Sequence, residues 1–218
     1  MKLLLTSAGI SNKSISNALL ELTEKPFSQL NLAFIPTASN VEKGDKDWLI
    51  DDLIRCKNLG FKSIDIIDIS ALPKDMWLPR LQEADIIYVE GGNTFHLMHW
   101  IEKSGLKELL PEMLKTKIYV GVSAGSMVVC ESLDMSTSKR LYYEEIEEYG
   151  KDEGLGFVDI LIRPHFNSPY FPNLNLKNLE KLSKEFSDTF YAIDDNTAIK
   201  VIDKKIEIIS EGEWKKFN

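Results

Sequence analysis

The chain has few cysteines and histidines, no excess of basic residues and no long hydrophobic run. Its two cysteines, Cys56 and Cys130, fall in segments predicted to be helical. This pattern favours reduced thiols in the cytoplasm over a disulfide framework. No apolar stretch approaches the length that crosses a membrane. The 26 basic residues are outnumbered by 34 acidic ones and form no patch, so we expect neither a nucleic-acid nor a membrane partner.

Hydrophobic residues make up 44% of the 218 positions, which is enough to build a sizeable core. Strand-like runs alternate with segments of helical periodicity along most of the chain. Such alternation predicts an α/β fold of three layers, in which helices cover both faces of a mainly parallel sheet. We find no linker or repeat, so we expect a single domain over residues 1–218. The strand-like runs lie at residues 2–6, 32–35, 64–69, 85–89, 155–162, 190–193, 197–202 and 205–209. Residues 134–154 are polar and acidic, and we expect them to be loop-like.

The most informative stretch passes from a predicted strand through Gly121-Val122-Ser123-Ala124-Gly125 into an apolar helix. A G-x-S-x-G pattern between a strand and a helix is typical of a serine nucleophile held on a sharp turn. In that geometry the amide of Ala124 can donate to an oxyanion. The alternative is a glycine-rich turn whose serine only caps the helix.

A serine nucleophile usually needs a histidine base, and the chain has three histidines. His165 follows a predicted strand and a proline, so we expect it at the ligand-binding edge of the sheet. His96 and His99 lie three positions apart on a predicted helix, where we expect partly exposed side chains. They could face one metal ion, but the sequence offers no third ligand. We therefore expect neither a metal nor another cofactor.

A second loop, Glu90-Gly91-Gly92-Asn93-Thr94, also joins a predicted strand to a helix. Its glycines allow close approach of the backbone to a ligand. Gly91 or Gly92 could supply a second oxyanion donor, and we group Asn93 with them as a candidate substrate-binding residue. The alternative is a tight turn capped by Asn93 or Thr94.

Three motifs together resemble the peptidase E family of serine peptidases, to which cyanophycinase is more distantly related. They are Gly-Gly-Asn-Thr-Phe at 91–95, Gly-Val-Ser-Ala-Gly at 121–125 and Pro-His-Phe at 164–166. The resemblance covers essentially the whole chain. It implies a fold similar to that of class I glutamine amidotransferases, and a dipeptidase activity of the kind that peptidase E has on Asp-X dipeptides.

Carried over by motif, the resemblance implies that Ser123 is the nucleophile and His165 the base. It implies Gly92 and Ala124 as the oxyanion donors. The family places its acid between the serine and the histidine, but the matching motif is absent here. We favour Glu144 for this role.

The other candidates for the acid are Glu145, Asp134 and Asp152, all between Ser123 and His165 in the chain. Recognition of an N-terminal aspartate should also require a cation near the substrate carboxylate. Arg163 and Arg140 are the candidates for that cation.

Two other functions compete with a peptidase that acts on small peptides. An esterase of the α/β-hydrolase kind has the same order of serine, acid and histidine, but the short distance from Ser123 to His165 in the chain leaves little room for its elements. A non-catalytic, amidotransferase-like binding module would need no reactive serine. For the oligomeric state we expect a monomer or a homodimer.

Overall fold

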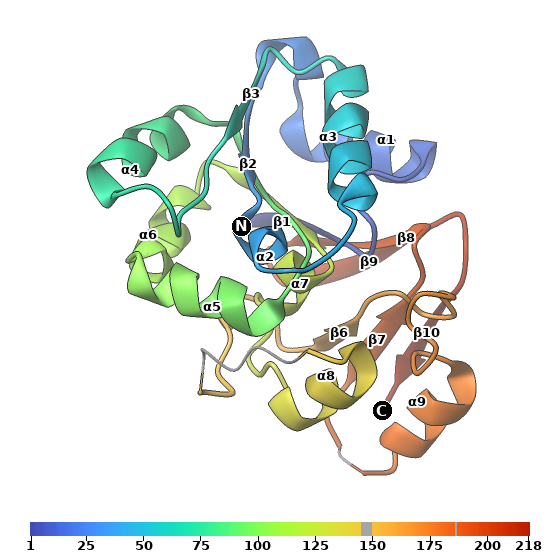
Figure 1. The fold of residues 1–218 in the computed structure, drawn as a ribbon. Coiled ribbons are helices and arrows are strands. Elements are labelled where there is room, and N and C mark those ends of the chain that lie inside the picture. The colour runs from blue at the N-terminus through green and yellow to red at the C-terminus, as the bar shows by residue number, and fades with distance from the viewer. Residues whose placement is uncertain (145–149, 186) are drawn as a thin grey trace.

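The structure is a computed structural model that describes residues 1–144, 150–185 and 187–218. Strands and helices alternate along the first half of the chain, and strands dominate its end (Figure 1). The elements are β1 (Lys2–Thr6), α1 (Lys13–Thr23), η1 (Phe27–Gln29), β2 (Asn31–Ile35), α2 (Thr37–Asn40), α3 (Asp47–Leu59), β3 (Ser63–Ile66), α4 (Lys74–Glu83), β4 (Ile86–Val89), α5 (Thr94–Lys103), α6 (Leu106–Met113), β5 (Ile118–Val122), α7 (Ala124–Met127), α8 (Met135–Tyr142), β6 (Leu161–Arg163), α9 (Leu176–Leu182), β7 (Phe190–Ile193), β8 (Thr197–Ile202), β9 (Lys205–Ser210) and β10 (Trp214–Phe217).

The central sheet has seven strands in the order β3-β2-β4-β5-β1-β8-β9. The first five of these strands run parallel to one another, and β8 and β9 add an antiparallel hairpin at one side. The prediction of an α/β fold with a mainly parallel central sheet is therefore confirmed.

Two hydrophobic clusters cover the two faces of this sheet. In β1, Leu3 and Leu5 belong to one cluster while Leu4 belongs to the other, as the two-residue period of a strand requires. Helices α4, α5 and α6 pack on the face of Leu3, and α1 and α3 pack on the face of Leu4 (Figure 1). Burial on both faces explains why the parallel strands are almost continuously apolar.

A second, smaller sheet of three strands in the order β10-β7-β6 lies beside α8 and α9 (Figure 1). The sequence predicted a strand over residues 155–162, but only Leu161–Arg163 forms β6. Residues 134–154 were expected to be loop-like, yet Met135–Tyr142 forms the helix α8. Two of the buried residues of this helix, Thr137 and Ser138, are polar, so its sequence shows little apolar character around buried Leu141.

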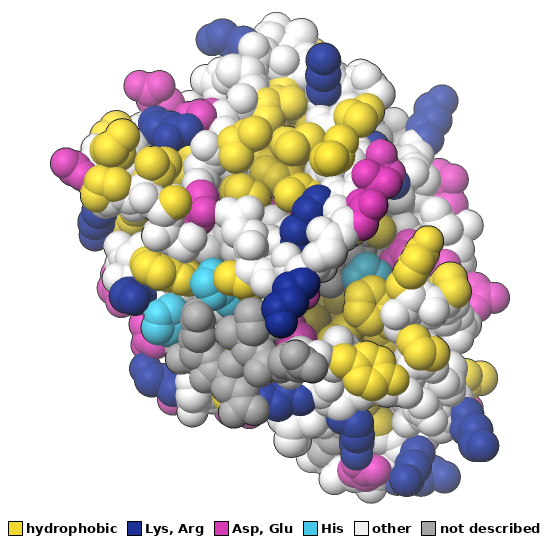
Figure 2. Space-filling view, in the orientation of Figure 1, with side chains coloured by type: hydrophobic (Ala, Val, Ile, Leu, Met, Phe, Trp, Pro, Cys, Tyr) yellow, Lys and Arg dark blue, Asp and Glu magenta, His cyan; other side chains and the backbone are white. Residues whose placement is uncertain are grey.

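Exposed hydrophobic side chains gather over α3 and the edge strand β3, as Figure 2 shows. They are Trp48, Ile50, Ile54 and Ile66. Among the described residues, no helix has the length and the apolar character to span a membrane.

Candidate active site

Ser123 lies on the sharp turn that the sequence predicted, between the end of β5 and the start of α7. Its backbone has φ 46° and ψ −108°, a conformation that non-glycine residues rarely adopt. A hydrogen bond of 3.0 Å from its N–H to the carbonyl of Thr6 fixes the turn to the end of β1. The side chain of Ser123 thereby leaves the backbone at the edge of the sheet.

The small residues around Ser123 are required by close approaches of the backbone. A Cβ on Gly125 would lie 2.1 Å from the carbonyl oxygen of Val89, and a Cβ on Gly121 would lie 2.6 Å from that of Gly125. A Cβ on Gly91 would lie 3.2 Å from the Cβ of Ser123. The Gly-rich loop after β4 is therefore packed directly against the serine.

His165 stands next to Ser123. The Nε2 atom of His165 is 2.9 Å from Ser123 Oγ, and its imidazole stacks on Phe171 with ring centroids 4.4 Å apart. The residue comes two positions after the end of β6, so the expected place at a strand end is confirmed, although the strand belongs to the small sheet.

The carboxylate on the other side of the imidazole is that of Asp195. Its Oδ1 atom is 2.7 Å from His165 Nδ1. A carboxylate accepts hydrogen bonds, so Nδ1 carries the proton and Nε2 is left to accept one from Ser123. Burial alone would raise the pKa of Asp195, but hydrogen bonds from His165 and Ser7, together with the charge of Arg55, lower it.

Ser7, directly after β1, completes this group. Its hydroxyl donates to Asp195 Oδ1 at 2.6 Å and accepts the backbone N–H of His165 at 2.8 Å. Ser7 is fully buried. It therefore fixes the relative positions of the histidine and the aspartate.

The expectation that Glu144 contacts His165 is wrong. Glu144 Oε1 accepts the backbone N–H of Thr94 at 2.6 Å, at the first turn of α5. Burial raises the pKa of Glu144, and the hydrogen bonds from Thr94 oppose that shift. Its carboxylate thus accepts a hydrogen bond at the N-terminus of α5, where a negative charge is favourable.

None of the other described candidates for the acid contacts His165 either. Asp134 pairs with Arg163, and Asp152 accepts hydrogen bonds from Ser132 and Met135. Glu145 lies outside the described residues.

Asp195 was missed because only acids before the histidine were considered. The sequence signal for Asp195 is its position just after the predicted strand at residues 190–193. Strands β6 and β7 are parallel neighbours with Arg163 opposite Ala192. Both His165 and Asp195 come two residues after their strands end, at the same edge of the small sheet.

The two arginines proposed to bind a substrate carboxylate are engaged elsewhere. Arg163 is 1% exposed, and its Nη2 donates to Asp134 at 2.6 Å. Arg140 is paired with Glu185 at 3.1 Å. The prediction that Arg163 binds substrate is therefore wrong, because its guanidinium is buried and paired.

Gly91, Gly92 and Asn93 have different roles in the loop after β4. The N–H of Gly91 donates to Glu90 Oε1 at 2.9 Å, so Gly91 is not available as an oxyanion donor. Asn93 Oδ1 accepts the N–H of His96 at 2.8 Å and caps α5, as the alternative reading predicted. Gly92, at φ 127°, donates no backbone hydrogen bond to a described residue.

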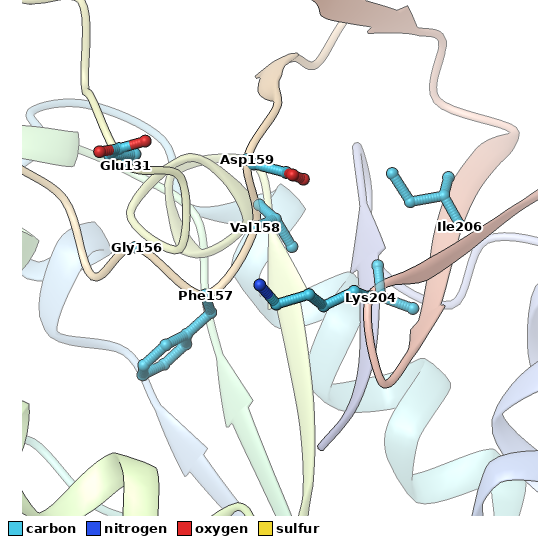
Figure 3. A pocket seen from close by; sticks show the side chains of 8 residues that line it. Glu131, Gly156, Phe157, Val158, Asp159, Lys204 and Ile206 are labelled. Atoms are coloured by element: carbon cyan, nitrogen blue, oxygen red, sulfur yellow. The ribbon is translucent and has the colours of Figure 1, made fainter.

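His96 is buried rather than partly exposed, whereas His99 is half-buried. Within the ranges that the structure describes, no group of three or more histidine, cysteine or acidic side chains could hold a metal ion. A hollow of about 260 Å³ lies between residues 156–159 and the β8–β9 hairpin (Figure 3). It contains neither Ser123 nor His165, so we do not assign a substrate to it.

An α/β fold that links a serine, a histidine and an aspartate in this order has the arrangement of a serine hydrolase. The comparison with known families agrees. The profile of peptidase family S51 matches residues 3–209, and the chain belongs to this family.

Curated relatives and solved structures are similar over most of the chain. An uncharacterized peptidase of Listeria innocua, Lin0382, is 28% identical over 80% of this chain and 82% of its own. A peptidase E of a Nostoc species is 29% identical over 59% of this chain and 54% of its own. The crystal structure of a proposed peptidase E protein from Listeria monocytogenes superposes with a TM-score of 0.80 at 24% identity, covering 97% of this chain and 98% of the other. That structural similarity supports the α/β fold with a mainly parallel central sheet.

Proposed function

We propose that this chain is a serine peptidase that hydrolyses small peptides with Ser123 as nucleophile, His165 as base and Asp195 as the orienting acid. The observation that carries the proposal is the chain of two hydrogen bonds from Ser123 Oγ to His165 Nε2 and from His165 Nδ1 to Asp195. Membership of peptidase family S51 supports it.

In this mechanism Ser123 Oγ attacks the carbonyl carbon of the scissile peptide bond while His165 Nε2 takes its proton. Asp195 keeps Nδ1 protonated and stabilises the imidazolium. His165 then gives the proton to the leaving amine, and the acyl-enzyme forms. A water molecule, activated by His165 in the same way, releases the acid product.

The oxyanion of each tetrahedral intermediate would be held by the backbone N–H groups of Gly92 and Ala124. Neither group donates a hydrogen bond to a described residue. Gly92 belongs to the loop packed against Ser123, and Ala124 is the first residue of α7, directly after Ser123. Two preorganised donors of this kind typically contribute several kcal/mol to the stabilisation of the transition state.

Specificity for an N-terminal aspartate requires a cation, and Arg55 is a better candidate than Arg163. The side chain of Arg55 is 41% exposed, and its charge lowers the pKa of Asp195. Among the described residues, its hydrogen bonds come from Nη1 alone, which donates to the carbonyl of Ala8 at 3.0 Å and to Asp52 at 2.6 Å. Its Nε and Nη2 atoms donate to no described residue and could bind a substrate carboxylate.

A library of dipeptides tests the proposal, with Ser123→Ala as the matched control. We expect the wild-type chain to release free amino acids from some of the dipeptides, and the variant to release none. Activity on Asp-X dipeptides that falls in Arg55→Gln, while other dipeptides are still cleaved, would support the assigned specificity. Hydrolysis of simple esters without any peptide cleavage would favour the esterase, and no turnover of either would favour the binding module.

We also propose a cytoplasmic location. Both cysteines are buried and unpaired, which fits a reducing compartment.

A further inference from the structure

Two acidic side chains, Glu90 and Asp52, are buried together behind the candidate active site. Glu90 is 0% exposed and Asp52 is 3% exposed. Glu90 follows β4 and precedes the Gly91–Gly92 loop, whereas Asp52 lies in the middle of α3. Acidic side chains are almost never buried to this degree unless a partner compensates them, so the pair needs an explanation.

The pair touches both sides of the site. Glu90 Oε1 accepts the N–H of Gly91, the residue packed against the Cβ of Ser123. Asp52 accepts a hydrogen bond from Arg55, and Arg55 also donates to the carbonyl of Ala8, the neighbour of Ser7. The two carboxyl groups therefore connect the loop beside the serine with the segment that fixes His165 and Asp195.

The same cluster contains two polar atoms without a hydrogen-bond partner among the described residues, Glu90 Oε2 and the hydroxyl of Tyr88. Both residues are fully buried. A Cβ on Gly9 would lie 2.6 Å from the Tyr88 hydroxyl and 2.7 Å from Asp52 Oδ1, so the Tyr88 hydroxyl and the Asp52 carboxyl group lie close together beside Gly9. A proton on Glu90 Oε2 would turn that atom into a donor that Asp52 can accept.

We propose that Glu90 and Asp52 share one proton at neutral pH, with Glu90 as the neutral acid, and that Glu90 is a positioning residue that holds the Gly91–Gly92 loop against Ser123. The catalytic part of this inference rests on the proposed function. The shared proton is a property of the fold and does not depend on it.

The surrounding charges agree with this distribution of the proton. Burial raises the pKa of Glu90 well above its ordinary value, and the Asp52 carboxylate raises it further. Burial also raises the pKa of Asp52, to about 6, although Arg55 opposes the shift. The other titratable groups that face the pair are Asp51 and Cys56 from α3 and Tyr88 from β4.

The first experiment measures unfolding by urea at several pH values in the wild type and in Glu90→Gln. The pKa of Glu90 is raised in the folded chain, so unfolding releases its proton and becomes easier as the pH rises. Glutamine imitates the neutral acid but has no proton to release. We expect the unfolding constant of the wild type, relative to the variant, to rise about tenfold per pH unit between pH 5 and pH 7.

Exposed Glu83, at the end of α4, provides the matched control. The same change there, Glu83→Gln, should leave the pH dependence of unfolding as in the wild type. If Glu90→Gln also leaves it unchanged, Glu90 is ionised in the folded chain and the shared proton is ruled out.

The second experiment measures how fast a fluorophosphonate probe labels Ser123 in Glu90→Gln and in Glu90→Leu. Glutamine keeps an acceptor for the Gly91 N–H and a donor toward Asp52, whereas leucine keeps neither. We expect the glutamine variant to react within about threefold of the wild type, and the leucine variant about tenfold or more slowly, as the loss of one buried hydrogen bond suggests. Equal rates for both variants would contradict the positioning role.

If Glu90→Leu does not fold, Glu90→Ala replaces it, and urea unfolding of that variant is compared at pH 5 and pH 7. The pH dependence of unfolding in Glu90→Gln still decides whether Glu90 carries the proton. Failure of the proposed function is recognised separately. A wild-type chain that neither cleaves peptides nor reacts with the probe would refute the peptidase, and the unfolding experiment would still test the proton.

Discussion

At the scale of single residues, the position of Asp195 determines which nitrogen of His165 faces Ser123. The carboxylate accepts from Nδ1 and the hydroxyl of Ser7. We predict that Asp195→Asn lowers kcat/KM by about a hundredfold to ten-thousandfold, because the amide can stabilise the wrong tautomer and no longer stabilises the imidazolium.

Glu144→Gln is the matched comparison, since it removes the charge of the acid that the sequence favoured. We expect it to change kcat/KM by less than about tenfold, because its hydrogen bond to Thr94 can be kept. Steady-state kinetics with the best dipeptide of the library measures both variants. A larger loss in Glu144→Gln than in Asp195→Asn would refute the assignment of the acid.

Arg163 belongs to the same scale, as a structural residue. Its side chain is 2% exposed and pairs with Asp134 Oδ2, which lies at the start of α8. We predict that Asp134→Asn destabilises the fold by about 3–5 kcal/mol, because it leaves a buried guanidinium without an anion. Asparagine tolerates the left-handed conformation of this position, so the backbone should not add to the loss.

Urea unfolding measures this difference, and Arg140→Gln, which removes an exposed pair with Glu185, serves as the control with an expected cost of about 1 kcal/mol or less. A cost for Asp134→Asn as small as that of the control would show that the Arg163 pair does not stabilise the fold.

At the scale of elements, the turn from β5 to α7 depends on glycine. A Cβ on Gly125 would overlap the carbonyl of Val89 at 2.1 Å, and the backbone on both sides is buried. We predict that Gly125→Ala destabilises the chain by about 3 kcal/mol or more, as strong overpacking does. A Cβ on Gly150 meets no atom of a described residue within 4 Å, so Gly150→Ala should have an effect of about 0.5 kcal/mol or less. Thermal unfolding of both variants is the measurement, and equal melting temperatures would contradict the close packing of this turn.

Elements also differ in how far they could be predicted from the sequence. The strands β1, β2 and β4 and the turn at Ser123 have local signals, namely apolar runs and a glycine pattern, and they were found. The contact of His165 with Asp195 depends on the pairing of β6 with β7, which no local signal encodes. The same holds for Glu90, whose burial follows from the packing of α3 on the sheet.

Short or polar elements were missed for a related reason. Helix α8 buries Thr137 and Ser138 beside Leu141, so most of its buried side chains are polar and its sequence resembles that of a loop. Strand β6 has three residues and is held by its neighbour β7. In both cases the tertiary context decides the structure, and the sequence of the segment alone does not.

At the scale of the whole molecule, the candidate site joins the two sheets. The central sheet supplies Ser123 and Ser7, whereas the small sheet supplies His165 and Asp195. Residues of both sheets belong to one hydrophobic cluster, for example Leu3 and Phe190. We predict a single cooperative unfolding transition, measured by calorimetry, in which the calorimetric and van't Hoff enthalpies agree. Two separate transitions would show that the sheets unfold independently.

The proposed mechanism depends on Ser123 as the nucleophile that His165 activates. We would test it by labelling with a fluorophosphonate probe, followed by mass spectrometry of the digested chain. We predict one adduct, on Ser123, which is absent in Ser123→Ala and forms at least about a hundredfold more slowly in His165→Ala. An unlabelled wild-type chain, or an adduct on another serine that persists in Ser123→Ala, would show that Ser123 is not the nucleophile.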